Sequence, residues 1–167
     1  MEAADRERSG FGADMAFHEF DLETFPWPVD RGFALVTAIE VIEHMRDPIG
    51  FLSGIRELLD EDGLAVITTP YMESLASRLR FLASGKLRQM DAAGDPTHVS
   101  PIFIDLLRRR YLPAAELRLD RHLLYPPVGH LAVRPWLQPP FRVISRFLPH
   151  ELTGDTSVFF LRQDRAP

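Results

Sequence analysis

Two glutamates and a histidine are spaced so that they could act together. Glu40, Glu43 and His44 lie at positions i, i+3 and i+4, which share one face if the chain is helical there. Two carboxylates and an imidazole are good ligands for a divalent cation, and buried charges need partners. The alternative is a solvated helical turn in which His44 bonds a backbone carbonyl, and the spacing alone favours that alternative.

Two further residues could belong to a site. His98 lies in the run Gly94-Asp95-Pro96-Thr97-His98-Val99-Ser100. It is two residues before Ser100-Pro101, a pair that is typical of a helix start. Asp21 lies in a loop that contains two prolines. Taken alone, His98 is a loop histidine beside a helix cap, and Asp21 is a turn residue.

The elements that must position these residues follow from the hydrophobic pattern. Residues 33–39 and 64–69 are apolar runs with β-branched side chains, as in strands buried on both faces. Asp47-Pro48 predicts the start of a helix between them, and Gly63 is expected just past its end. Such a strand–helix–strand unit implies a parallel sheet. Ligands bind beyond the carboxyl ends of parallel strands, so the residues that follow each run are the site candidates.

The remaining pattern predicts a single α/β domain over residues 1–167. A proline- and aromatic-rich stretch within residues 126–155 is expected to form a cap or insertion before the last strand. The further elements that we expect are strands at 14–20, 117–124 and 156–161, helices at 74–84 and 100–110, and a short helical piece near 142–147.

Composition excludes several classes of protein. The chain has a net charge of −5 and no cysteine, and no apolar run is long enough to cross a bilayer. We therefore expect a cytoplasmic protein with no membrane span. We do not expect nucleic acid as a partner, because arginine clusters such as Arg108-Arg109-Arg110 are usually solvated helix faces.

The run FALVTAIEVIEHMRDPIGFLSGIRELLDEDGLAVITTP resembles the fourth strand, the following helix and the fifth strand of class I S-adenosylmethionine (SAM)-dependent methyltransferases. Phe20-Asp21-Leu22 is similar to the acidic loop that reads the adenine in those enzymes. The resemblance implies a Rossmann-like fold and SAM as the cofactor. It also implies that SAM contacts Asp21, Leu22, Ala38, Ile39 and Glu40.

Two subgroups share the E-x-x-E-H run: ubiquinone-pathway O-methyltransferases and small-RNA 2′-O-methyltransferases. The second resemblance implies that Glu40, Glu43, His44 and His98 bind Mg²⁺ or Mn²⁺, with Glu43 and His44 as catalytic residues. The expected reaction is O-methyl transfer to a small-molecule or glycan- or lipid-type hydroxyl. Relatives without a metal also carry this run, so a metal-free site stays open.

One departure from the family pattern bears on the whole chain. No glycine-rich turn that follows a hydrophobic strand precedes Asp21. We therefore expect a partial, N-terminally truncated fold, in which residues 33–39 form an unprotected edge strand that could self-associate. The chain is then a truncated reading frame, half of a split or dimerising protein, or a remnant without cofactor. A non-catalytic interaction module is the alternative function.

Overall fold

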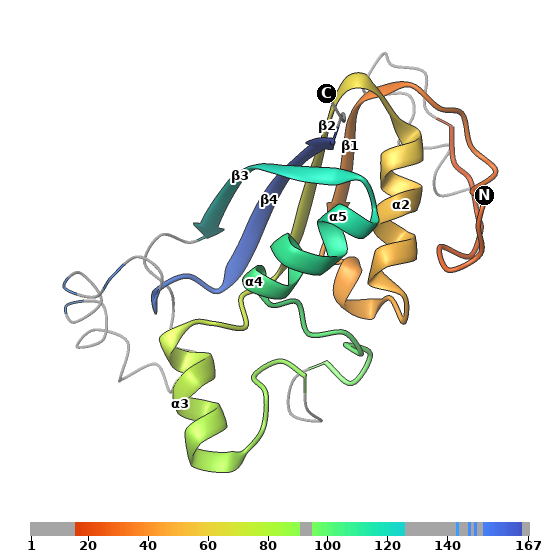
Figure 1. The fold of residues 1–167 in the computed structure, drawn as a ribbon. Coiled ribbons are helices and arrows are strands. Elements are labelled where there is room, and N and C mark those ends of the chain that lie inside the picture. Colours follow the sequence, from red (N-terminus) through yellow and green to blue (C-terminus); the bar gives the residue numbers. More distant parts are fainter. Residues whose placement is uncertain are drawn as a thin grey trace, which may run out of the picture.

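The computed structural model describes residues 16–90, 95–125, 143, 147, 149 and 152–164. Its centre is a four-stranded sheet in the order β1-β2-β4-β3. The strands are β1 (Phe33–Ile39), β2 (Leu59–Pro70), β3 (Leu117–Tyr125) and β4 (Thr156–Gln163). Strands β1 and β2 are parallel, whereas β4 runs antiparallel to both of its neighbours (Figure 1).

The first half of the sheet is the predicted strand–helix–strand unit. Strand β1 leads through the 3₁₀ turn η2 (Ile42–His44) to α2 (Pro48–Leu58), which continues into β2. Asp47 caps α2 by accepting a hydrogen bond from Gly50 N at 2.9 Å, and Pro48 occupies the first turn. Both features are those expected from the sequence.

One face of the sheet packs against helices (Figure 1). Phe51, Leu52 and Ile55 of α2 are buried in a single core with apolar side chains of β2 and β4. The other covering element joins α4 (Ile104–Leu106), the π-helical turn η3 (Leu107–Tyr111) and α5 (Leu112–Ala114). Helix α3 (Leu75–Ser84) instead projects away from this layer. No helix in the described part of the chain is long and apolar enough to cross a membrane.

Three sequence-based expectations about element boundaries were wrong. Residues 16–20 form no strand, because alternating apolar residues need a neighbouring strand to pair with. Gly63 lies inside β2 rather than after a helix. A Cβ at Gly63 would lie 2.7 Å from the carbonyl oxygen of Phe33, so glycine permits the irregular pairing at the start of β1.

The third wrong expectation is the helix cap at Ser100. The helix begins at Ile104, and its N-cap, Phe103, makes no side-chain cap bond. Glu73 instead accepts a hydrogen bond from Ile104 N at 2.8 Å, whereas the Ser100 hydroxyl donates to the carbonyl of Met45. A distant carboxylate thus replaces the local cap. The expected helical piece near 142–147 and most of the 126–155 insertion fall outside the described residues.

Candidate functional site

The site lies where β1 and β2 end. Glu40 follows β1 directly and has a positive φ of 53°, a conformation that side chains other than glycine rarely adopt. Its backbone N–H donates to the Thr68 hydroxyl at 3.0 Å, and that hydroxyl donates to Glu40 Oε1 at 3.0 Å. Thr68 of β2 therefore holds the strained residue in place. Such strain is typical of functional sites.

Glu43 is a buried carboxylate without a hydrogen bond. Its side chain is 1% exposed, and neither carboxylate oxygen has a hydrogen-bond partner among the described residues. A buried charge in this condition is costly. The side chain is therefore suited to a positively charged ligand.

The loop of residues 95–100 is fixed against η2 by the backbone. The carbonyl of Glu43 accepts hydrogen bonds from Val99 N and Ser100 N, both at 2.9 Å. These bonds bring His98 next to Glu43, with 4.0 Å between His98 Nε2 and Glu43 Oε1. Residues that are 55 positions apart in the sequence thus form one site.

The hydrogen bond made by His98 determines which ring nitrogen faces the carboxylate. Its Nδ1 lies 2.8 Å from the carbonyl oxygen of Gln89, which can only accept, so Nδ1 carries the proton. In the neutral ring Nε2 then presents a lone pair toward Glu43. Asp95 Oδ2 lies 3.8 Å from the same Nε2.

His44 is oriented in the same way. Its Nδ1 lies 2.9 Å from the Thr97 hydroxyl and 3.2 Å from the Thr97 carbonyl. That hydroxyl donates its own proton to Asp95 at 2.6 Å, so Nδ1–H of His44 must be the donor to Thr97. Nε2 of His44 is left with its lone pair. The imidazole rings of His44 and His98 pack edge to face, with 4.7 Å between their centroids.

Glu43, His44 and His98 together form a candidate metal site. One ligand atom from each lies within 4.8 Å of the others, a spacing that a modest side-chain adjustment can close around one ion, since bonds to imidazole nitrogen are about 2.1 Å. In metal centres the second ring nitrogen commonly donates to a backbone carbonyl, as it does here for both histidines. Glu40 is not in this group and bonds Thr68 instead.

Electrostatics also distinguish Glu43. Burial raises the pKa of its carboxyl group, and the negative charge of Glu40 adds to that effect. The dipoles of its own backbone N–H and of the Thr69 hydroxyl, together with His98, lower the pKa and offset only part of the increase. Neither dipole is aligned well enough with the carboxylate to count as a hydrogen bond. By contrast, the hydrogen bonds from the hydroxyl and backbone N–H of Thr97 lower the pKa of Asp95, which remains an anion that holds Thr97 in place.

The expected cofactor residues lie on neighbouring segments. Asp21 accepts hydrogen bonds from Glu23 N at 2.9 Å and from the Thr24 hydroxyl at 3.3 Å, so its carboxylate closes a turn. Glu23 accepts a hydrogen bond from Arg46 N at 2.6 Å, which ties this loop to the segment after η2. At the end of β1, Ala38 is buried and Ile39 is 58% exposed.

Leu22 packs against the core, and its carbonyl accepts a hydrogen bond from Trp27 Nε1 at 3.0 Å. The loop and the strand end could therefore supply one side of a cofactor site. Among the described residues before Asp21, positions 16–20 form no strand.

Three residues that orient the histidines were not identified as site residues from the sequence. Thr97 and Asp95 fix His44, and the backbone of Gln89 fixes His98. The Asp95-x-Thr97 spacing, typical of a side-chain-closed turn, could have identified the first two. No sequence signal indicates the role of Gln89, because its carbonyl group acts rather than its side chain.

The fold resembles those of several solved proteins, methyltransferases among them. The YcgJ protein from Bacillus subtilis aligns over 99% of this chain and 77% of its own, with a TM-score of 0.57 and 13% identity. A putative methyltransferase from Bacillus halodurans aligns over 98% of this chain and 77% of its own, with a TM-score of 0.54 and 16% identity. An S-adenosylmethionine-dependent methyltransferase from Clostridium acetobutylicum aligns over 98% of this chain and 70% of its own, with a TM-score of 0.55 and 11% identity.

At these identities the likeness establishes the fold, which is that of a Rossmann-like class I methyltransferase. The chain spans 60% of the length of a similar methyltransferase from Archaeoglobus fulgidus. A search of curated proteins finds no match. Residues 2–117, more than half of the chain, match a family described as "Methyltransferase domain", and the chain therefore belongs to the methyltransferase-domain family.

Proposed function

We propose that this chain takes part in SAM-dependent methyl transfer to a hydroxyl group, with Glu43, His44 and His98 holding a divalent cation beside the acceptor. The observation that carries the proposal is the buried carboxylate of Glu43, which has no hydrogen-bond partner among the described residues and faces His98 Nε2. Membership of the methyltransferase-domain family supports the class of reaction.

The side chains have separable roles in this proposal. Bound SAM supplies an electrophilic methyl group, and a bound cation lowers the pKa of the acceptor hydroxyl. Glu43 and His44, the proposed catalytic residues, and His98 hold the acceptor end of the site. Asp21, Leu22, Ala38, Ile39 and Glu40 hold the cofactor end. Imidazole nitrogens favour Mn²⁺ over Mg²⁺, which prefers oxygen ligands. The acceptor that we propose is a small-molecule or glycan- or lipid-type hydroxyl.

Direct metal binding tests the cation site without requiring activity. Electron paramagnetic resonance of added Mn²⁺ should show one bound ion per wild-type chain. Glu43→Gln and His98→Ala should each weaken binding by about tenfold or more. His18→Ala, at an exposed histidine in the loop before β1, is the matched control and should bind normally. Equal binding by all four proteins would refute the cation site.

The orientation of His44 provides a second test. Thr97→Val keeps the shape and the backbone carbonyl of residue 97 but removes the hydroxyl that accepts from His44 and donates to Asp95. We expect Mn²⁺ affinity to fall by about tenfold and Thr97→Ser to restore it. If Thr97→Val and Thr97→Ser bind Mn²⁺ with the same affinity, the hydroxyl does not position His44.

Calorimetric titration with SAM tests the cofactor separately. We expect binding that is strengthened by Mn²⁺, because the acceptor and cofactor ends adjoin. Absence of SAM binding in a folded sample would refute this half of the proposal and leave the metal result standing. A non-catalytic partner role would then be favoured by the edge of β1 that pairs with no other described strand, where Leu35 and Ile39 are 57% and 58% exposed.

A further inference from the structure

Helix α3 buries a polar side chain and exposes large apolar ones, the reverse of the usual arrangement. Ser77 is the only residue of the helix that is buried, and its hydroxyl donates to the carbonyl of Tyr71 at 3.2 Å. The N-cap, Ser74, is also buried and accepts from Ser77 N. Serines thus attach the helix to the end of β2. A helix of a water-soluble protein usually makes such contacts with its apolar residues.

The apolar residues of α3 face the solvent instead. Leu79, Phe81 and Leu82 are 50%, 54% and 84% exposed. Leu79 and Leu82, three positions apart, are neighbours on the helix surface. Large exposed apolar side chains gathered on one helix are of the kind that marks an interaction surface. In Figure 1 the helix stands apart from the layer formed by α2, α4 and α5.

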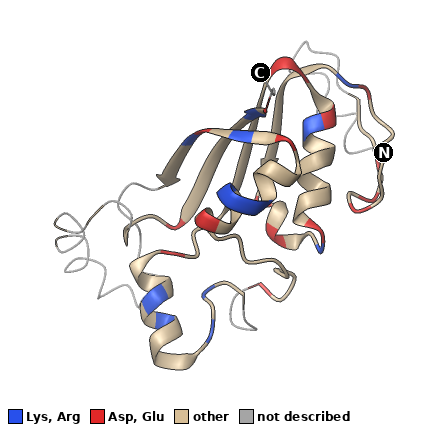
Figure 2. Cartoon of the chain, in the orientation of Figure 1, with Lys and Arg blue, Asp and Glu red and all other residues tan. Residues whose placement is uncertain are grey.

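The same surface is basic in a chain whose net charge is negative. Residues 74–90 contain four basic residues and no Asp or Glu, whereas the whole chain has a charge of −5. Figure 2 shows blue but no red on α3. Arg78 and Lys86 are exposed, and Gly85, with a φ of 67°, ends the helix and turns the chain toward Lys86.

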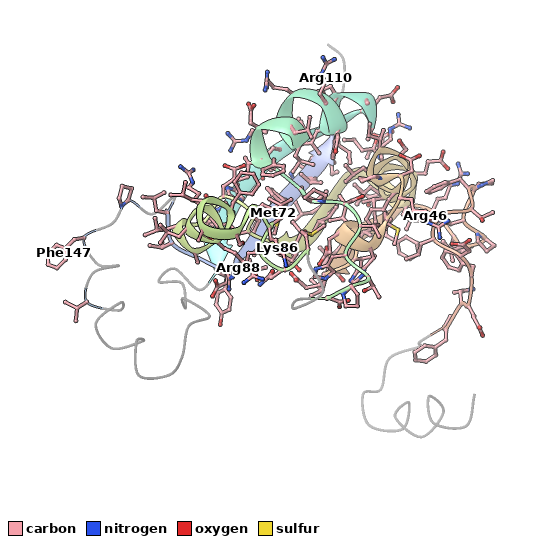
Figure 3. The ribbon with its side chains drawn as sticks, turned by 90° about the horizontal axis from the view of Figure 1, so that it is seen from below. Arg46, Met72, Lys86, Arg88, Arg110 and Phe147 are labelled. Atoms are coloured by element: carbon pink, nitrogen blue, oxygen red, sulfur yellow. The ribbon has the colours of Figure 1, made fainter. Side chains whose placement is uncertain are left out.

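Arg88 has a different role. It pairs with Asp155 at 2.8 Å, and its side chain is only 12% exposed. This ion pair anchors the segment after α3 to the end of the sheet near β4. Lys86 and Arg88 are both labelled below α3 in the view of Figure 3, but Lys86 alone belongs to the exposed surface.

We propose that the outer surface of α3, formed by Arg78, Leu79, Phe81, Leu82 and Lys86, binds an anionic lipid bilayer. An interfacial helix combines Lys or Arg with Leu and Phe in this way, burying the apolar groups at the headgroup boundary while the cations meet lipid phosphates. A nucleic acid would use the charges but would leave Leu82 without a contact. The charge of the segment, opposite to that of the rest of the chain, also orients the molecule with α3 toward the bilayer.

Vesicle flotation tests the proposal with the full chain. Wild-type protein should float with phosphatidylcholine vesicles that contain phosphatidylglycerol and bind much less to phosphatidylcholine alone. Added salt should weaken binding, because screening reduces attraction between exposed charges. Failure to float with anionic vesicles would refute the proposal, as would tighter binding to a single-stranded RNA than to those vesicles.

Two variants separate the apolar and electrostatic contributions. Leu82→Glu and Lys86→Glu should each weaken vesicle binding by about tenfold. Their matched controls are Leu106→Glu and Arg108→Glu, at exposed positions of α4 and η3, and these should bind like wild type. Equal losses in variants and controls would show a general charge effect and refute a role for α3.

A spectroscopic measurement avoids dependence on protein stability. In Phe81→Trp, a variant at an exposed position, anionic vesicles should shift the tryptophan emission to the blue, and bromine-labelled lipids should quench it. The same substitution at Phe103, the N-cap of α4, provides the comparison. Emission at residue 81 that is unchanged by vesicles would refute insertion of this surface.

Discussion

At the scale of single residues, the site depends on the burial of one carboxylate. Glu43 is nearly inaccessible to water and has no hydrogen-bond partner among the described residues, so the apoprotein is destabilised by the group that its proposed function needs. Stability and function should therefore respond in opposite directions when its charge is removed.

We predict that Glu43→Gln stabilises the apoprotein at neutral pH by about 1–3 kcal/mol, the usual cost of an unpaired buried polar group. Burial raises the pKa of Glu43 in the folded state. The wild type therefore loses stability as the pH rises from the unfolded pKa to the folded pKa. Chemical denaturation at a series of pH values measures this decline, which should be smaller in Glu43→Gln.

The control for this prediction is Glu57→Gln, at an exposed position of α2, which should change stability little at any pH. Saturating Mn²⁺ should reverse the order of stability, because the cation stabilises only the chain that binds it. A Glu43→Gln variant less stable than wild type without metal would contradict the prediction.

Site residues could be predicted where the side chain itself carries the chemistry. Glu43, His44 and His98 were predicted as a group only through the resemblance to metal-dependent methyltransferases, since residue spacing alone favoured other interpretations. The structure brings the three side chains together. Their orientation could not be predicted, because it depends on the carbonyl groups of Gln89 and Thr97. Every residue type has a backbone carbonyl group, so the sequence does not indicate which carbonyl will orient a histidine.

At the scale of elements, the strand–helix–strand unit was predictable, and the boundaries that depend on distant contacts were not. Buried strands and an Asp-Pro helix start are local signals, and both were confirmed in β1, α2 and β2. The start of α4 is set by Glu73, 31 residues away. Local patterns identified Ser100 instead because they cannot register a partner that distant.

Helix α2 also holds the loop that precedes β1. A Cβ at Gly54 would lie 2.5 Å from Phe25 and 2.9 Å from Trp27. Gly54→Ala should therefore displace these aromatic rings and destabilise the chain by about 1–3 kcal/mol, although alanine favours helix by about 1 kcal/mol. Thermal unfolding measures the net effect. Ser53→Ala on the same helix is the control, and a more stable Gly54→Ala would refute this packing role.

At the scale of the whole molecule, the two edges of the sheet differ. Strand β3 carries charged residues, among them Arg118, Asp120 and Arg121, which discourage pairing with another chain. Strand β1 has the sequence FALVTAI and no charge, and it pairs on one side only among the described residues. Among the described residues, β1 is thus an edge strand that lacks the charges found on β3.

We predict that the protein self-associates through β1 as its concentration rises. Light scattering coupled to size-exclusion chromatography should show a mass above that of the monomer. Leu35→Lys should shift the protein toward the monomer, since an edge lysine opposes strand pairing. Leu123→Lys on β3 is the matched control. A monomeric wild type, or equal effects of the two lysines, would contradict the prediction.

The position of β4 affects how the protein is made. This strand pairs with β2 and with β3, so the sheet cannot close until residues 156–163 have left the ribosome. During synthesis, β2 and β3 have no strand between them. Apolar residues such as Ile67 and Leu117, which are buried in the finished fold, stay exposed until Phe159 of β4 can pack with them. Pairing of such distant segments is slow and exposes aggregation-prone surface. The nascent chain should therefore depend on chaperones until β4 emerges.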